Sequence, residues 1–285
     1  MGTRCTIAVP SRDVDSANEI QHKLKHELFR IQHMLSWFSP NSELFQLNRH
    51  AHISPVKVSK ELFNLVEYSI EFHKTTNGYF DLTTRSLKHA PNETMRSELV
   101  QYIGMNKLVL DNKEQSIFFK NEYIDLDLGA IGKGYALDCL GKILQNHSIK
   151  HAFISLGDSS ILGYGTHPAG DSWPVGLAKD QKSNPNLSGN DPISTFNLYN
   201  ESLSISESYR YNQNSLRVAH NHIFNPKTGS VIDRQEQVIV QHKSALIAEF
   251  WSTSLLSMPK KEQAKFLENY PKDTKIWINT HNNIA

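Results

Sequence analysis

Residues 123 to 141, which read YIDLDLGAIGKGYALDCLG, constrain the fold of this chain more than any other stretch. Apolar residues first alternate with a tyrosine and two aspartates: Tyr123, Ile124, Asp125, Leu126, Asp127 and Leu128. A period of two indicates a short strand with both aspartates on one face. Leucines then recur at spacings of three and four, which indicates a helix packed on one face: Leu137, Leu140 and Leu144. The stretch therefore predicts a strand, a glycine-rich turn and the N-terminus of a helix.

The predicted turn contains three glycines and a lysine: Gly129, Gly132, Lys133 and Gly134. Free backbone N–H groups and the helix dipole suit such a turn to an anion. Lys133 adds a full positive charge there, and Asp127 can orient a polar ligand. The spacing fits neither the Walker phosphate-binding loop nor the dinucleotide-binding fingerprint. On spacing alone an alternative stays open, in which the glycines only allow the strand, turn and helix to pack closely.

Composition narrows the class of protein. A chain of 285 residues, 39% of them hydrophobic, has ample length for a core in one large domain or two of roughly 150 residues. A formal net charge of +1 without a Lys/Arg block argues against a nucleic-acid-binding protein. No run of about 18 apolar residues and no signal peptide is visible, so we expect no membrane span. The compartment stays open between the cytoplasm, for the chain as it stands, and a periplasmic or membrane-attached place if an export signal has been removed.

Apolar periodicity and turn residues predict the order of the main elements. Strands are expected at residues 5–9, 107–110, 116–119, 151–156, 196–205 and 238–240, and helices at 15–35, 42–48, 59–77, 93 onward and 244–258. Residues 180–191 are rich in Asn, Ser, Pro and Gly and predict a flexible loop. His22 and His26 lie four apart on the first helix, but no third ligand is near, so we favour solvated histidines over a zinc site. Cys5 and Cys139 are interpreted as free thiols.

Six separated motifs occur in a fixed order along the chain. They are Met1-Gly2-Thr3, the serine–aromatic turn and the residues after it from Ser36 to Asn48, Thr76 to Asp81, Asp127 to Asp138, His222 to Gly229, and Ala248 to Thr253. Together they resemble the motifs of the ApbE family of flavin transferases (FAD:protein FMN transferases). The resemblance implies an α+β fold with mixed, largely antiparallel sheets and flanking helices, related to the T-fold. It also implies one domain over residues 1–285, with two lobes around a nucleotide cleft.

The resemblance further implies a reaction, a cofactor and a partner. Such proteins bind FAD and a divalent cation, usually Mg²⁺, release AMP and attach FMN through its phosphate to a threonine of a target protein. A subunit of a membrane redox complex is one candidate for that target. Mapped by motif, the flavin nucleotide is bordered by Met1, Phe38, Tyr79, Phe80, Asp81, Asp127, Lys133 and Ile223. The metal ligands are the carbonyl of Ala130 with the side chains of Glu249 and Thr253.

The residues themselves agree with this assignment of the metal site. Glu249 and Thr253 are four apart, so both face one side of their predicted helix. A carboxylate, a hydroxyl and a backbone carbonyl are hard oxygen ligands suited to Mg²⁺. A solvated helix face is the alternative for Glu249, but its apolar neighbours make an unpaired carboxylate there expensive. His222 lies beside a tight turn and can help deprotonate an incoming hydroxyl, or else be a neutral histidine bonded to backbone. His222 and Lys133 are the two candidate catalytic residues.

Three positions depart from the family pattern. Asp158 follows Gly157 where a second glycine is usual, so we expect a different loop, because aspartate lacks the freedom of glycine at positive φ. Glu249 replaces an aspartate, which moves the carboxylate by roughly an ångström or more. Residues 206–209 put bulkier side chains near the expected adenine side. Three hypotheses therefore stand: FMN transfer to a protein, FAD binding or hydrolysis without a protein acceptor, and a non-catalytic scaffold.

Overall fold

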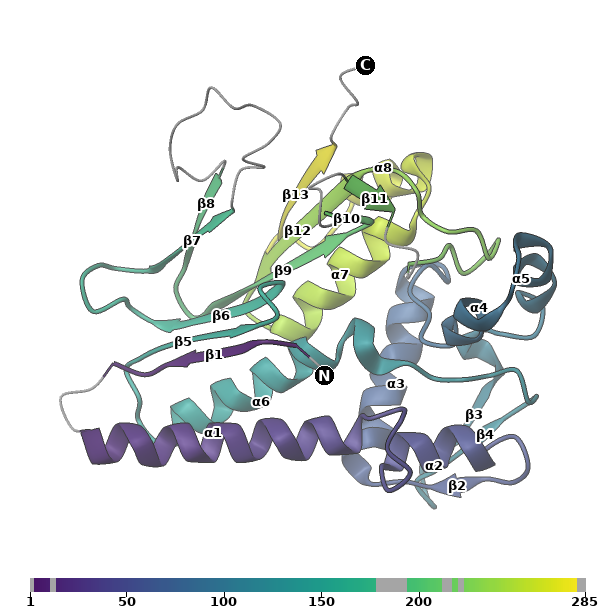
Figure 1. Cartoon of the computed structure of the whole chain (residues 1–285), viewed down its shortest axis with the longest axis horizontal. Coiled ribbons are helices and arrows are strands. Elements are labelled where there is room, and N and C mark those ends of the chain that lie inside the picture. Colours follow the sequence, from purple (N-terminus) through teal and green to yellow (C-terminus); the bar gives the residue numbers. More distant parts are fainter. Residues whose placement is uncertain (1–2, 11–13, 178–193, 212–216, 220–222, 281–285) are drawn as a thin grey trace.

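The structure is a computed structural model, and it describes residues 3–10, 14–177, 194–211, 217–219 and 223–280. Its centre is an antiparallel six-stranded sheet with the order β1-β5-β6-β9-β12-β13 (Figure 1). The strands are β1 (Cys5–Ala8), β5 (His151–Leu156), β6 (Ser160–Gly165), β9 (Glu201–Glu207), β12 (Glu236–His242) and β13 (Lys275–Thr280). No described helix combines the length and the apolar character needed to cross a membrane.

Side chains alternate across this sheet, and each face has its own cover. On one face, Ile154 and Leu162 pack with the buried leucines of α6 (Gly132–Asn146). Helix α7 (Ala245–Ser257) lies on the same side, and its residues Ala248 and Leu255 share a core cluster with Val238 and Val240 of β12. Residues of the other face pack under the hairpin of β7 (Trp173–Leu177) and β8 (Ser194–Leu198): Ile161, Leu203 and Ile239. The two central helices are therefore buried between the sheet and the rest of the molecule.

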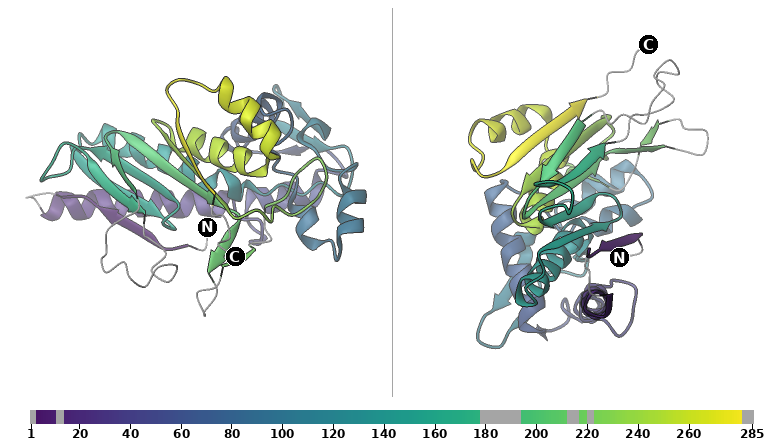
Figure 2. Two further views of the ribbon diagram at one scale, coloured as in Figure 1. Left: turned by 90° about the horizontal axis from the view of Figure 1, so that it is seen from above. Right: turned by 90° about the vertical axis from the view of Figure 1, so that its left-hand side faces the viewer.

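The long helix α1 (Val14–Met34) forms a further layer on α6 (Figure 1). Its apolar positions Ile20, Leu24, Leu28 and Ile31 are buried. Figure 2 shows α1, in purple, end-on beneath the sheet in its right-hand view. His22 and His26 lie exposed on this helix.

A second group of elements packs beside the sheet layers, on the right in Figure 1. Its two main helices are α2 (Glu43–His50) and α3 (Lys60–Thr75), and the side chains of Ser42 and Ser59 cap their N-termini. The other members are α4 (Arg85–His89), α5 (Glu93–Leu99), η1 (Met105–Lys107), η2 (Leu128–Ala130) and the sheet of β2 (Val56–Lys57), β4 (Ser116–Phe119) and β3 (Leu108–Asp111). One large core cluster joins this group to α7 and β12. The remaining elements are β10 (Tyr209–Tyr211), β11 (Arg217–Ala219) and α8 (Lys260–Glu268).

The expected fold class is confirmed: helices flank largely antiparallel sheets. Two details of the predicted strands are wrong. The segment from Ile124 to Leu128 joins no sheet, although the predicted alternation holds and its apolar residues are buried. The predicted strand at 196–205 is two strands, because Asn200 turns the chain at φ 50°. The predicted loop at 180–191 lies outside the described residues, and the division into two lobes stays a prediction.

Candidate active site where α6 meets α7

Helices α6 and α7 touch through backbone, with a glycine between them. A Cβ atom on Gly134 would overlap the carbonyl of Ala245 and approach a carboxylate oxygen of Glu249 to 2.9 Å. One turn along α6, Asp138 accepts hydrogen bonds from the Ser244 hydroxyl at 2.6 Å and the Ala245 amide at 2.7 Å. Since these groups form the N-terminus of α7, Asp138 caps that helix from outside. The contact fixes α7 relative to the N-terminal turn of α6.

The Glu249 carboxylate lies in this contact and is 2% exposed. Its Oε2 accepts the Gly134 N–H at 2.6 Å, and its Oε1 accepts the hydroxyl of Ser160 on β6 at 2.5 Å. The ammonium of Lys133 lies 3.2 Å from Oε1. Residues 127–133 and 249–253 are therefore side by side, as the predicted site requires. The Gly134 amide is directed at Glu249 and not at the Ala130 carbonyl, so the first regular bond of α6 is from Tyr135 to Ile131.

The donor set at this point fits a hard divalent cation. Thr253 lies one turn beyond Glu249 on α7 and is half-buried, with the Ser206 hydroxyl 3.5 Å from its own. The Ala130 carbonyl belongs to η2, directly before α6, and lacks the helical hydrogen bond that Gly134 would give it in a regular helix. Carboxylate, hydroxyl and carbonyl oxygens are the ligands that Mg²⁺ takes in proteins. Glu249, Thr253 and Ala130 are the residues that would hold it.

The segment that leads into α6 is held by side chains from elsewhere. Asn48, at the end of the Ser36–Asn48 motif on α2, donates to the Leu126 carbonyl and accepts from the Leu126 amide, each at 2.9 Å. The Asp127 amide donates to the Leu82 carbonyl at 2.9 Å, and a single parallel bridge joins Asp125 to Thr84. The backbone is thereby extended without a β-sheet, and both aspartates face away from the core.

Both aspartates are paired with cations from α4. Asp127 Oδ2 lies 2.8 Å from Lys88 Nζ, and its Oδ1 accepts the Gly129 amide at 2.9 Å. Burial raises the pKa of Asp127, but Lys88 and the Gly129 amide outweigh burial, so the pKa lies below its usual value. Asp125 pairs with Arg85, yet burial is the larger influence and raises the pKa of Asp125. Asp127 is therefore an ionised group at neutral pH.

The aromatic side chain of Trp37 lies beside Arg85 of α4, and that of Phe38 lies beside Trp37. The Arg85 guanidinium lies over the Trp37 ring, 3.7 Å from its centroid, and Trp37 meets Phe38 edge-to-face with ring centroids 5.4 Å apart. Phe38 is 61% exposed. A large apolar ring this open is available to a planar ligand, and the place of Phe38 beside the flavin stays a prediction.

The side chains from Tyr79 to Asp81 mainly make contacts within the protein. The Phe80 ring is 1% exposed and packs among Phe72 and Phe250, so its side chain belongs to the core. The Tyr79 ring lies beneath the ammonium of Lys227, 4.2 Å from the ring centroid. Asp81 Oδ1 accepts the Thr83 amide at 2.7 Å and the Thr83 hydroxyl at 2.5 Å. The predicted roles of these three residues beside the flavin stay predictions.

The Thr76–Asp81 turn faces the turn at Asn225–Gly229 across a pocket of about 490 Å³. Its lining includes His73, Asp81 and Lys227. Ile223, another predicted flavin neighbour, is half-buried against the main core just before this second turn. Met1 and His222 lie outside the described residues, so their predicted roles rest on the resemblance.

The departures from the family pattern are accommodated within the fold. Gly157 and Asp158 both adopt left-handed conformations, with φ of 67° and 57°, so the aspartate takes up the conformation that a glycine favours. Its carboxylate lies 3.4 Å from the Ser155 hydroxyl. Ser206 on β9 contacts Ser252 of α7 at 2.9 Å. Glu207 contacts Gln237 on the neighbouring strand.

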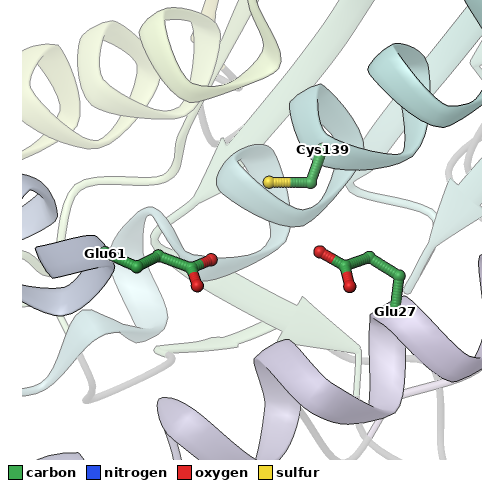
Figure 3. A group of neighbouring side chains, drawn as sticks. All are labelled: Glu27, Glu61 and Cys139. Atoms are coloured by element: carbon green, nitrogen blue, oxygen red, sulfur yellow. The ribbon is translucent and has the colours of Figure 1, made fainter. Parts of the chain in front are cut away.

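A separate acidic cluster lies on the α1 side of α6, formed by Glu27, Glu61 and Cys139 (Figure 3). Arg30 bonds both carboxylates, at 2.7 to 2.8 Å, and Tyr135 donates to Glu61 at 2.5 Å. Burial is the main cause that raises the pKa of the Cys139 thiol. The arginine already supplies the positive charge here, so this cluster ties three helices together.

Three residues of the site were missed by the sequence reasoning or given no role: Lys88, Asp138 and Ser160. Asp138 stands inside a matched motif, and its spacing of four from Gly134 on an apolar helix was a usable signal for a contact with another helix. Lys88 and Ser160 lie in no periodic pattern, so nothing in the sequence connects them to Asp127 and Glu249.

The sequence profile of the ApbE family matches residues 1–278. This chain belongs to the ApbE family. Curated relatives named FAD:protein FMN transferase include those of Escherichia coli K12, 25% identical over 92% of this chain and 77% of the relative, and Salmonella typhimurium, 26% identical over 90% and 76%. Among solved structures, the ApbE protein of Thermotoga maritima has a TM-score of 0.82 at 22% identity, covering 98% of this chain and 94% of that one. The flavin transferase ApbE of Vibrio cholerae also has a TM-score of 0.82, at 19% identity, covering 99% and 92%. The ApbE fold thus extends over nearly the whole chain.

Proposed function

We propose that this chain is an FAD:protein FMN transferase, which moves FMN from FAD to a threonine hydroxyl of a target protein, releases AMP and uses Mg²⁺. The names of the curated relatives support flavin transfer to a protein. The observation that carries the proposal for this chain is the pair of Lys133 and buried Glu249, 3.2 Å apart at the N-terminus of α6. A cation and the carboxylate proposed to hold the metal meet at the place where the resemblance implies the diphosphate of FAD.

Different residues of the site would bind the diphosphate, the flavin and the metal. Lys133 and the N-terminus of α6 attract the diphosphate, and Phe38 offers an exposed ring to the flavin nucleotide. Asp127, held by Lys88 and the Gly129 amide, presents a fixed acceptor to the ligand. Magnesium held by Glu249, Thr253 and the Ala130 carbonyl would neutralise the diphosphate and the charge that develops on it during transfer.

The reaction replaces one bond to phosphorus by another. The threonine oxygen attacks the phosphorus of the FMN half in line, and the bond from that phosphorus to the bridging oxygen breaks. The bridging oxygen keeps the electron pair and leaves as part of AMP, while the threonine proton passes to a base. His222 is the base that the resemblance implies. Water in place of threonine would give FMN and AMP, which is the hydrolytic alternative.

The test combines the protein with FAD, Mg²⁺ and a threonine-containing peptide from a candidate target. In-gel flavin fluorescence and mass spectrometry detect the labelled peptide, and chromatography detects AMP. We expect labelling with release of one AMP per flavin attached. Release of AMP without labelling would favour hydrolysis, and FAD binding without either product would contradict the proposal. A protein that binds no FAD at micromolar concentration would be a scaffold.

A matched pair of variants tests the metal site. Glu249→Gln keeps the size of the side chain but removes its charge, so metal-dependent AMP release should be lost. Glu114→Gln makes the same change at an exposed turn, where the glutamate pairs with Lys57, and should leave AMP release unchanged. Unchanged release by Glu249→Gln would show that this residue does not hold the metal.

A further inference from the structure

Lys133 forms an ion pair with Glu249, whose carboxylate would also have to bind the proposed metal. The Glu249 side chain is 3% exposed, and the two oxygens together accept from Gly134 N–H, Ser160 Oγ–H and Lys133. A buried carboxylate needs a compensating positive charge, and Lys133 supplies one here. A divalent cation on the same carboxylate would stand in contact with the ammonium, and two like charges at that separation repel strongly in a site shielded from water.

Of the two partners, Lys133 is the one that can move. Glu249 is held by a backbone amide and a buried hydroxyl, on a helix packed directly against α6 at Gly134. The Lys133 side chain is 24% exposed and ends a flexible four-carbon stem. A cation bound to this carboxylate would therefore displace the lysine and leave the carboxylate in place.

The structure also limits where the displaced ammonium finds a new partner. Asp127, the first acidic residue before Lys133 in the sequence, already pairs with Lys88 at 2.8 Å. Its other oxygen accepts the Gly129 amide. The diphosphate of the nucleotide would supply a second anion for the displaced ammonium at the N-terminus of α6.

We propose that Lys133 is exchanged between two anions: it pairs with Glu249 before the cation binds and with the nucleotide diphosphate afterwards. This inference rests on the proposed function and deepens it by giving the order of events. The exchange links the two ligands, because the cation must break an ion pair to bind and thereby releases the group that binds the nucleotide. Cation binding and nucleotide binding thus strengthen one another through Lys133, in addition to direct contact between metal and phosphate.

The first experiment follows Lys133 in the wild-type protein without any turnover. An amine-reactive reagent is applied briefly, and the modified fraction of each lysine is measured by mass spectrometry. We expect Mg²⁺ alone to raise the modification rate of Lys133 several-fold and added FAD to lower it again. Lys57, paired with exposed Glu114, serves as the internal control and should not respond. A Lys133 rate that does not change at saturating Mg²⁺ would overturn the exchange.

The second experiment measures affinity for Mn²⁺ alone by calorimetry and electron paramagnetic resonance. Lys133→Met keeps the length of the side chain but removes the competing charge, so Mn²⁺ should bind about tenfold more tightly than in the wild type. Equal or weaker Mn²⁺ binding by this variant would overturn the proposal. FMN transfer by a wild-type protein whose Lys133 does not respond to Mg²⁺ would refute the exchange and leave the proposed function standing. The exchange without any FMN transfer would refute the function alone.

Discussion

The backbone N–H of Gly134 on α6 donates to Oε2 of Glu249 on α7 at 2.6 Å, so the candidate active site is built on direct contact between two helices. A side chain at position 134 would force them apart, because its Cβ would overlap the Ala245 carbonyl. Gly134→Ala should therefore lower the free energy of unfolding by about 1–3 kcal/mol in urea denaturation, despite the better helix propensity of alanine.

Gly141 on the same helix is the matched control. A Cβ there meets only Leu162 Cδ2 at 3.7 Å, which is an ordinary contact. Gly141→Ala should raise the free energy of unfolding by up to about 1 kcal/mol. Equal effects of the two substitutions would show that the helices do not touch at Gly134.

Ser160 stabilises the fold by donating to a buried carboxylate. Ser160→Ala leaves Glu249 with one donor fewer and should lower the free energy of unfolding by about 1.5–3 kcal/mol. Ser202, which pairs with Leu162 across β6 and β9, is also buried, but its hydroxyl has no hydrogen-bond partner among the described residues. Ser202→Ala should be neutral or stabilising. Chemical denaturation of the two variants checks the assignment, and a larger loss for Ser202→Ala would contradict it.

Arg30 neutralises two glutamates at the contact of α1, α3 and α6. Arg30→Met leaves Glu27 and Glu61 facing one another, and it should lower the free energy of unfolding by about 1–3 kcal/mol. Lys57 pairs with Glu114 on an open surface, with 74% and 51% of their side chains exposed, so Lys57→Met should lower stability much less than Arg30→Met. Thermal unfolding compares the pair, and similar losses would mean that the Arg30 contacts contribute no more than a surface ion pair.

His73 should make stability depend on pH near neutrality. Burial lowers the pKa of His73, but the hydrogen bond and charge of Asp81 and the Phe80 carbonyl outweigh it, so the folded pKa is raised. A raised histidine pKa means that the folded state binds the proton more tightly than the unfolded state. The stabilisation is full below about pH 6.5 and is lost as the pH rises through the folded pKa.

Urea denaturation at pH 5.5 and pH 8.5 measures this dependence. The wild type should lose more stability between these two pH values than His73→Gln does. His33→Gln, on the exposed side of α1, should keep the dependence of the wild type. A dependence that survives in His73→Gln would assign it to another group.

The sequence predicted the parts of the site that depend on helix periodicity. The spacing of Glu249 and Thr253 placed both on one side of α7, and the leucines of α6 indicated its buried face. The strand predicted at Ile124 to Leu128 was wrong for a physical reason. Alternating burial there comes from side chains and single carbonyl contacts, which a sequence cannot distinguish from a neighbouring strand.

The partners of Glu249 were beyond sequence reasoning for another reason. Replacing aspartate by glutamate was expected to shift the carboxylate, but its destination depends on which donors lie within reach. Gly134 is 115 residues away in sequence and Ser160 is 89. Only the packing of α6, α7 and β6 brings these donors together.

The Asn48 amide that fixes Leu126 has a consequence for how the site forms and opens. The two residues are 78 positions apart, so their bond closes a long loop that becomes favourable only when α2 has docked. The central sheet does not depend on that bond. Local opening at α2 would release the segment before α6 while the sheet persists, and hydrogen exchange should show the Leu126 amide exchanging faster than those of β9 and β12.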